Sequence, residues 1–218
     1  MSNEKSNVEY TLGEDIANSI SHGIGFALSI SGLVILVVCA SLYGDVWRIV
    51  SFSIYGFSLM LLYIASTLYH SFRGKRVKYV FRILDHTSIF VLIAGTYTPL
   101  LLVNMRNAFG WTIFGIIWGL AITGIVFKSI FVDRYGKIAV CIYLLMGWLC
   151  VIAFKQLLLS LTFKGMLWLS MGGLSYTLGI IFYAWDRLPY NHAIWHLFVL
   201  GGSILHFFAI YFYVLPVK

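Results

Sequence analysis

The sequence contains few charged residues, few cysteines and no long polar segment. Only 11% of its 218 residues are charged, against roughly 25% in an ordinary soluble domain. In contrast, 61% are hydrophobic and the mean hydropathy is +0.91, which excludes a soluble globular domain. The three cysteines, Cys39, Cys141 and Cys150, lie in apolar stretches without a CxxC pair and are predicted to be packing residues. Because no glycine-rich phosphate loop, internal repeat or low-complexity tract is present, nucleotide chemistry has no support.

Long apolar runs make up most of the sequence. A helix needs roughly 20 apolar residues to cross a bilayer, and seven runs approach or exceed that length. They lie at about Ser19 to Leu42, Val46 to His70, Leu84 to Met105, Phe109 to Phe131, Ile138 to Leu161, Gly165 to Trp185 and Ala193 to Leu215. We therefore expect an all-α polytopic membrane protein, a seven-transmembrane-helix bundle in which residues 1–218 form one domain after a short cytoplasmic segment, 1–18. That segment is acidic, unlike a signal peptide.

The basic residues predict the orientation of the bundle. A net charge of +7 could indicate nucleic acid, but the lysines and arginines fall between apolar runs, where the positive-inside bias explains them. The loop from Arg73 to Arg82 gives the strongest signal, although it could also contact anionic headgroups. We expect a cytoplasmic N-terminus and an outside C-terminus in a bacterial plasma membrane, with membrane lipids as partners and no nucleic acid.

This orientation brings polar residues from several runs to the inner face. His70 closes the second run, Asp85 opens the third, and His192 and His196 open the seventh, while His22 lies near the start of the first. Residues four apart share one helix face, so His192 and His196 can reach one cation. A third imidazole, from His70, completes a three-nitrogen zinc site with an open fourth position.

Other polar residues have less specific patterns. Asp85 is expected to hold a ligand or act as general base, because an unpaired carboxylate in an apolar run is costly. Ser66 lies one turn from His70 and could bond a ligand, a water or a substrate carbonyl. An interfacial role is preferred for His22 and His86. His206 lies about 21 Å beyond His192, so a hydrogen bond across the bundle is preferred to a proton relay.

Taken together, the motifs resemble the hemolysin III family, the bacterial branch of the progestin and adipoQ receptor (PAQR) superfamily. They are Ser66-x-x-x-His70, Leu84-Asp85, Gly95-Thr96-Tyr97-Thr98-Pro99, His192-Ala-Ile-Trp-His196 and His206-Phe207, within about Glu14 to Tyr211. The resemblance implies seven helices and a zinc ion held by His70, His192 and His196, with Asp85 facing the activated water and Ser66 nearby. Receptor function does not carry over, because a long N-terminal extension is missing.

Three functions follow from these observations. Membrane ceramidases in the wider superfamily imply a zinc-dependent hydrolase of lipid amides or esters, ceramidase-like, with Asp85 and Ser66 as catalytic residues. The alternative is a non-catalytic sensor of membrane fluidity with a structural zinc, in line with the membrane homeostasis associated with bacterial members. A pore-forming haemolysin or channel ranks last, because residues in the middle of the runs are mostly apolar.

Overall fold

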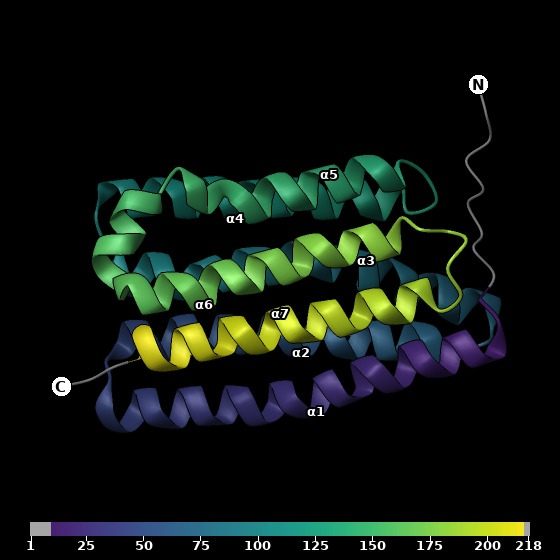
Figure 1. The fold of residues 1–218 in the computed structure, drawn as a ribbon, viewed down its shortest axis with the longest axis horizontal. Helices are drawn as coiled ribbons and strands as arrows, with labels where there is room; N and C mark the ends of the chain where they lie inside the picture. The colour runs from purple at the N-terminus through teal and green to yellow at the C-terminus, as the bar shows by residue number, and fades with distance from the viewer. Residues whose placement is uncertain (1–9, 216–218) are drawn as a thin grey trace.

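The computed structural model describes residues 10–215, and this part of the chain is helical throughout, with no strand (Figure 1). The helices are α1 (Leu12–Tyr43), α2 (Val46–Ser71), α3 (Lys75–Pro99), α4 (Ala108–Ile130), α5 (Gly136–Gly147), α6 (Phe154–Tyr183) and α7 (Asn191–Tyr213). The all-α prediction is confirmed. Helix α1 already begins within the segment expected to be extramembrane, whose residues 1–9 lie outside the described part.

Six helices in residues 10–215 are long and apolar enough to cross a membrane: α1, α2, α3 with its extension to Asn104, α4, α6 and α7. The remaining apolar helix, Gly136–Val151, is shorter. The fifth predicted run is therefore not one continuous helix, because α5 ends at Gly147 and a 3-10 turn, Trp148–Val151, follows. The break expected before the sixth run is present at Thr162, where φ is 65° and ψ is 165° inside α6.

The third helix differs from its prediction at both ends. It begins at Lys75, about two and a half turns before the predicted start, so most basic residues of the loop lie in its exposed first turns. At the other end Pro99 lacks the N–H that an α-helical bond requires. The chain continues there as a π-helix, Leu100–Asn104, a form usually found as a local interruption of α-helices. The proline therefore changes the helix type.

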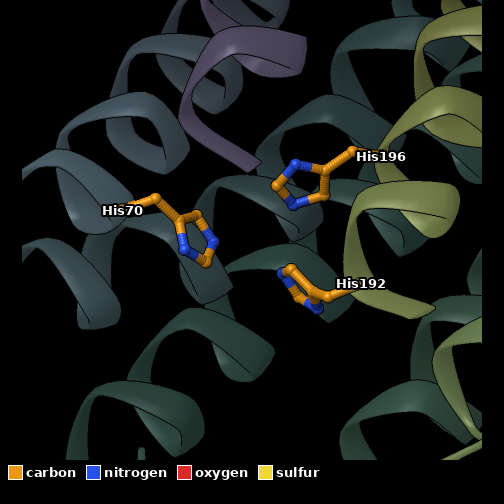
Figure 2. Close-up of side chains that lie close together, drawn as sticks. All are labelled: His70, His192 and His196. Carbon is orange, nitrogen blue, oxygen red and sulfur yellow. The ribbon is translucent and has the colours of Figure 1, made fainter. Parts of the chain in front are cut away.

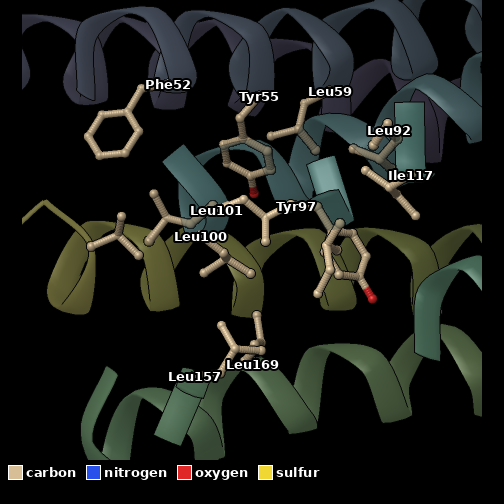
Figure 3. Packing of buried hydrophobic residues seen from close by; sticks show 14 of the residues in the cluster. Phe52, Tyr55, Leu59, Leu92, Tyr97, Leu100, Leu101, Ile117, Leu157 and Leu169 are labelled. Carbon is tan, nitrogen blue, oxygen red and sulfur yellow. The ribbon is translucent and has the colours of Figure 1, made fainter. Parts of the chain in front are cut away.

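Helices α1 to α5 each contact the next in order, α6 packs on α7, and α1 also packs on α7 (Figure 1). Among the six long helices α3 is the most buried. Figure 3 shows part of the apolar core, in which Phe52 and Tyr55 of α2 face Leu100, Leu101 and residues of α6. This core holds the helices in register, so that one end of the bundle collects the end of α2 and the starts of α1, α3 and α7.

Polar contacts fix the starts of α1 and α7 to each other. Thr11 caps α1, and its capping box is completed by the Glu14 carboxylate, which accepts from the Thr11 backbone N–H at 2.8 Å. The other Glu14 oxygen accepts from the backbone N–H of Tyr190, the residue before α7, at 3.3 Å. One side chain therefore caps one helix and positions the first turn of another.

Candidate metal centre

Three histidines converge at this end of the bundle. Figure 2 shows His70, in the last turn of α2, reaching towards His192 and His196 in the first turns of α7. One ring nitrogen from each lies within 4.8 Å of the others, and the ring centroids are 4.5 to 5.4 Å apart. His70 and His196 are buried and His192 is partly buried. This group, the histidine cluster, could hold a metal ion.

The hydrogen bond of His70 fixes which of its nitrogens can bind a cation. Its Nδ1 lies 2.9 Å from Oδ1 of Asp15, and an ionised carboxylate can only accept. Nδ1 therefore carries the proton, and Nε2 keeps its lone pair. That Nε2 atom is buried and has no hydrogen-bond partner in the described part of the chain. Asp15 is held in turn by Lys78, whose Nζ donates to Oδ2 at 2.8 Å.

His196 is oriented in the same way by α1. Its Nδ1 donates to the backbone carbonyl of Asn18 at 3.2 Å and lies 3.1 Å from Oγ of Ser21, which leaves Nε2 with the lone pair. The Nε2 atom of His192 is buried without a partner. Three convergent imidazole nitrogens, two of them buried and unsatisfied, fit an imidazole-binding ion such as zinc.

Helix α1 supplies these supporting residues, and the sequence had placed only the neighbouring His22 at this face. Asp15, Asn18 and His22 follow at spacings of three and four, which places them on one face of a helix. The signal was available, but Asp15 was assigned to a polar segment before the first run. Since α1 begins at Leu12, that face reaches the histidine cluster.

Asp85 and Ser66 lie on the same side of the bundle as the cluster. Asp85 is buried and lines a cavity that also contacts His192 and His196. It lies ten residues into α3 rather than at the start, because α3 begins at Lys75. Ser66 is fully buried, and its hydroxyl has no hydrogen bond within 3.5 Å among the described residues, although it interacts with the Asp85 carboxylate.

The remaining histidines have distinct surroundings. His22 is not interfacial as expected, because it is buried and stacks on His196 with centroids 3.5 Å apart. His86 is partly buried beside the cavity, and its carbonyl accepts from the Tyr143 hydroxyl. His206 donates from Nε2 to the Leu169 carbonyl of α6 at 3.0 Å, so the preferred bond across the bundle is confirmed.

Tyr10 covers the cluster from outside the helices. Its ring centroid lies 5.3 Å from that of His70 and 5.1 Å from that of His192. The pKa of the Tyr10 hydroxyl is raised well above its ordinary value, because burial disfavours the charged phenolate. Tyr10 therefore remains neutral, and its ring packs against two members of the cluster.

A cavity of about 360 Å³ extends from the cluster into the bundle. Its lining reaches from His192 to His206, which are fourteen residues apart on α7 and thus separated by about 21 Å. Between them the walls are largely apolar and include Leu92, Leu144 and Leu169. The volume lies in the range of small-molecule sites, and the shape is long, apolar over most of its length and polar at one end.

Residues 10–207 match the family model described as haemolysin-III related. The chain is 53% identical over 203 residues to Hemolysin-3 of Bacillus cereus, which covers 93% of both chains. It is 50% identical to the Hemolysin-3 homolog of Bacillus subtilis (strain 168), over 95% of this chain and 98% of the relative. The human monocyte to macrophage differentiation factor is 30% identical over 93% of this chain and 85% of its own length. No solved structure matches the chain.

Proposed function

The chain belongs to the haemolysin III family of membrane proteins, and from this membership and the histidine cluster we propose that it is a zinc-dependent hydrolase of membrane lipid amides or esters. One observation carries the proposal: a long apolar cavity ends at a buried carboxylate and at His192 and His196, two of the three imidazoles of the histidine cluster. The apolar part suits an acyl chain, and the polar end suits the bond to be cleaved. The bacterial relatives support a place in a bacterial plasma membrane.

Each polar group has a defined task in this proposal. His70, His192 and His196 would hold a zinc ion, which would supply an activated water and a Lewis acid for a carbonyl. Asp85 is placed to take a proton from the attacking water and to return it to the leaving group. The Ser66 hydroxyl does not line the cavity, but it interacts with the Asp85 carboxylate, so its task is to orient that carboxylate.

Metal analysis of detergent-purified protein tests the site. We expect one zinc per chain in the wild type, and a loss of zinc with helical content retained in His192→Ala and His196→Ala. His206→Ala changes a histidine at the far end of the cavity and should keep the metal. Wild-type protein without stoichiometric metal would contradict the proposal.

The chemistry is tested separately with Asp85→Asn. This variant keeps all three imidazoles and should bind zinc, but it should not hydrolyse a fluorogenic N-acyl sphingoid lipid or fatty ester presented in mixed micelles. If Asp85→Asn instead preserves the response of cells to altered membrane fluidity, and the wild type hydrolyses neither lipid, the protein is a sensor with a structural zinc.

The name of one relative supports a second candidate. Hemolysin-3 of Bacillus cereus is 53% identical to this chain, which favours a membrane-disrupting activity. A dye-release assay on liposomes distinguishes the two candidates. Release that persists after His70, His192 and His196 are all replaced by alanine would support membrane disruption that is independent of the metal.

A further inference from the structure

His22 lies beside the histidine cluster without belonging to it. Its ring is stacked on His196, with centroids 3.5 Å apart and planes at 10°, and meets the ring of Tyr63 edge-on. Both of its nitrogens are buried, and neither has a hydrogen-bond partner among the described residues. A neutral imidazole has one N–H and one lone pair to satisfy, and buried polar atoms without partners are rare in proteins unless they serve a function.

The stacking determines where these nitrogens can act. Because the two rings are nearly parallel, the His22 nitrogens lie over the His196 ring, whose Nδ1 is already bonded to Asn18 and whose Nε2 faces the cluster. His22 also lines the polar end of the cavity, together with Asp85 and His192. A lipid whose chain fills the cavity would bring its amide or ester group against this ring.

We propose that His22 is a substrate-binding residue that donates a hydrogen bond to the carbonyl oxygen of the amide or ester held beside His196. The inference rests on the proposed function, since it requires both an occupied metal site and an acyl group in the cavity. A carbonyl oxygen can only accept, so it matches the N–H of His22. The bond strengthens as the oxygen gains negative charge during hydrolysis, which makes His22 a donor that stabilises the developing oxyanion.

Replacing His22 by phenylalanine distinguishes the hydrogen-bonding role of His22 from the packing of its ring. His22→Phe keeps an aromatic ring against His196 and Tyr63 but removes both nitrogens. His22→Gln keeps an N–H donor without the ring. His206→Phe is the matched control, because it makes the same exchange at the other end of the cavity.

The probe is acetohydroxamate, a small oxygen ligand with a carbonyl group, titrated into cobalt-loaded protein in detergent and followed by visible absorption. We expect wild-type cobalt uptake in all three variants. The dissociation constant of acetohydroxamate should rise roughly 10- to 100-fold in His22→Phe, as for the loss of a hydrogen bond to a charged group. It should stay within a few-fold of wild type in His22→Gln and His206→Phe.

Two results would overturn the inference while the metal site stands. Wild-type hydroxamate affinity in His22→Phe would mean that a structural water alone satisfies the His22 nitrogens. Loss of cobalt from His22→Phe would mean that His22 supports the metal instead. Should that variant not fold, His22→Leu compared with His22→Gln gives the same test. Wild-type protein that takes up no cobalt would contradict the proposed function itself.

Discussion

Asp15 holds the side of the His70 ring that faces away from the metal site. It accepts from Nδ1 at 2.9 Å and so directs Nε2 towards the cluster. Asparagine at position 15 keeps the size but loses the charge and can turn its amide N–H towards Nδ1. We expect Asp15→Asn to weaken zinc binding about 10- to 100-fold, as for other residues that orient metal-bound histidines. Competition with a zinc chelator measures the change.

The control for this prediction is Asp186→Asn, which neutralises an exposed carboxylate in the loop before α7. It changes the net charge equally, so it should leave zinc affinity unaltered. Equally weakened zinc binding in both variants would mean that Asp15 acts only through its contribution to the net charge of the protein. An unchanged affinity in Asp15→Asn would mean that His70 does not need its carboxylate partner to bind the metal.

Replacing Ser66 by alanine is expected to lower the activity without lowering the stability. The buried hydroxyl of Ser66 interacts with the Asp85 carboxylate but makes no hydrogen bond within 3.5 Å among the described residues, so its removal costs only a long contact. Ser66→Ala should therefore keep or raise the thermal midpoint in detergent, while lipid hydrolysis falls about 100-fold because the Asp85 carboxylate is no longer oriented. Ser58→Ala in the same helix removes a hydroxyl that donates to the Tyr55 carbonyl at 2.6 Å, and it should lower the midpoint. A destabilised Ser66→Ala would contradict this assignment.

At the level of single residues, the sequence predicted the histidine cluster but not the residues that orient its rings. His70, His192 and His196 could be placed together because helix periodicity and the charge of the loops gave their faces and depths. Asp15 was missed because it was assigned to the segment before the first run, and the contact of the Asn18 carbonyl with His196 was missed because a backbone carbonyl has no sequence signature. The stacking of His22 on His196 likewise depends on how α1 packs against α7.

Among the elements, α6 contains a strained residue. Thr162 has φ 65° and ψ 165°, a region that is nearly restricted to glycine. Thr162→Gly should remove about 1 kcal/mol of strain and raise the thermal midpoint. Thr123→Gly, in the regular exposed part of α4, should lower it, because glycine is a poor helix former. A lower midpoint in Thr162→Gly would show that the threonine side chain contributes more than its backbone costs.

The apolar runs predicted the presence of most helices but not where each helix begins and ends. Most apolar runs became helices near their predicted places, because a long apolar run in a membrane has few alternatives to a helix. Ile138–Leu161 was the exception. Its composition is uniformly apolar, so nothing in it marked the end of α5 at Gly147. The early start of α3 was missed because its first turns are basic and exposed.

For the whole molecule, the histidine cluster constrains the number of membrane crossings. His70 ends α2 and the cluster joins it to the first turns of α7, so both lie on one side of the membrane. The chain between them must then cross an even number of times. Helices α3, α4 and α6 are long enough to cross and give only three crossings. We therefore predict that α5, continued by the 3-10 turn and the first turns of α6, supplies the fourth crossing.

We therefore expect seven crossings, with the N-terminus inside and the C-terminus outside. Alkaline phosphatase, which is active only outside the cytoplasm, should be inactive when fused after Arg134 or Arg187 and active when fused after Lys218. If α5 did not cross, Arg187 would lie outside and Lys218 inside, while the Arg134 fusion would be unchanged. An active Arg187 fusion would also place the start of α7 across the membrane from His70, and the histidine cluster could not then form.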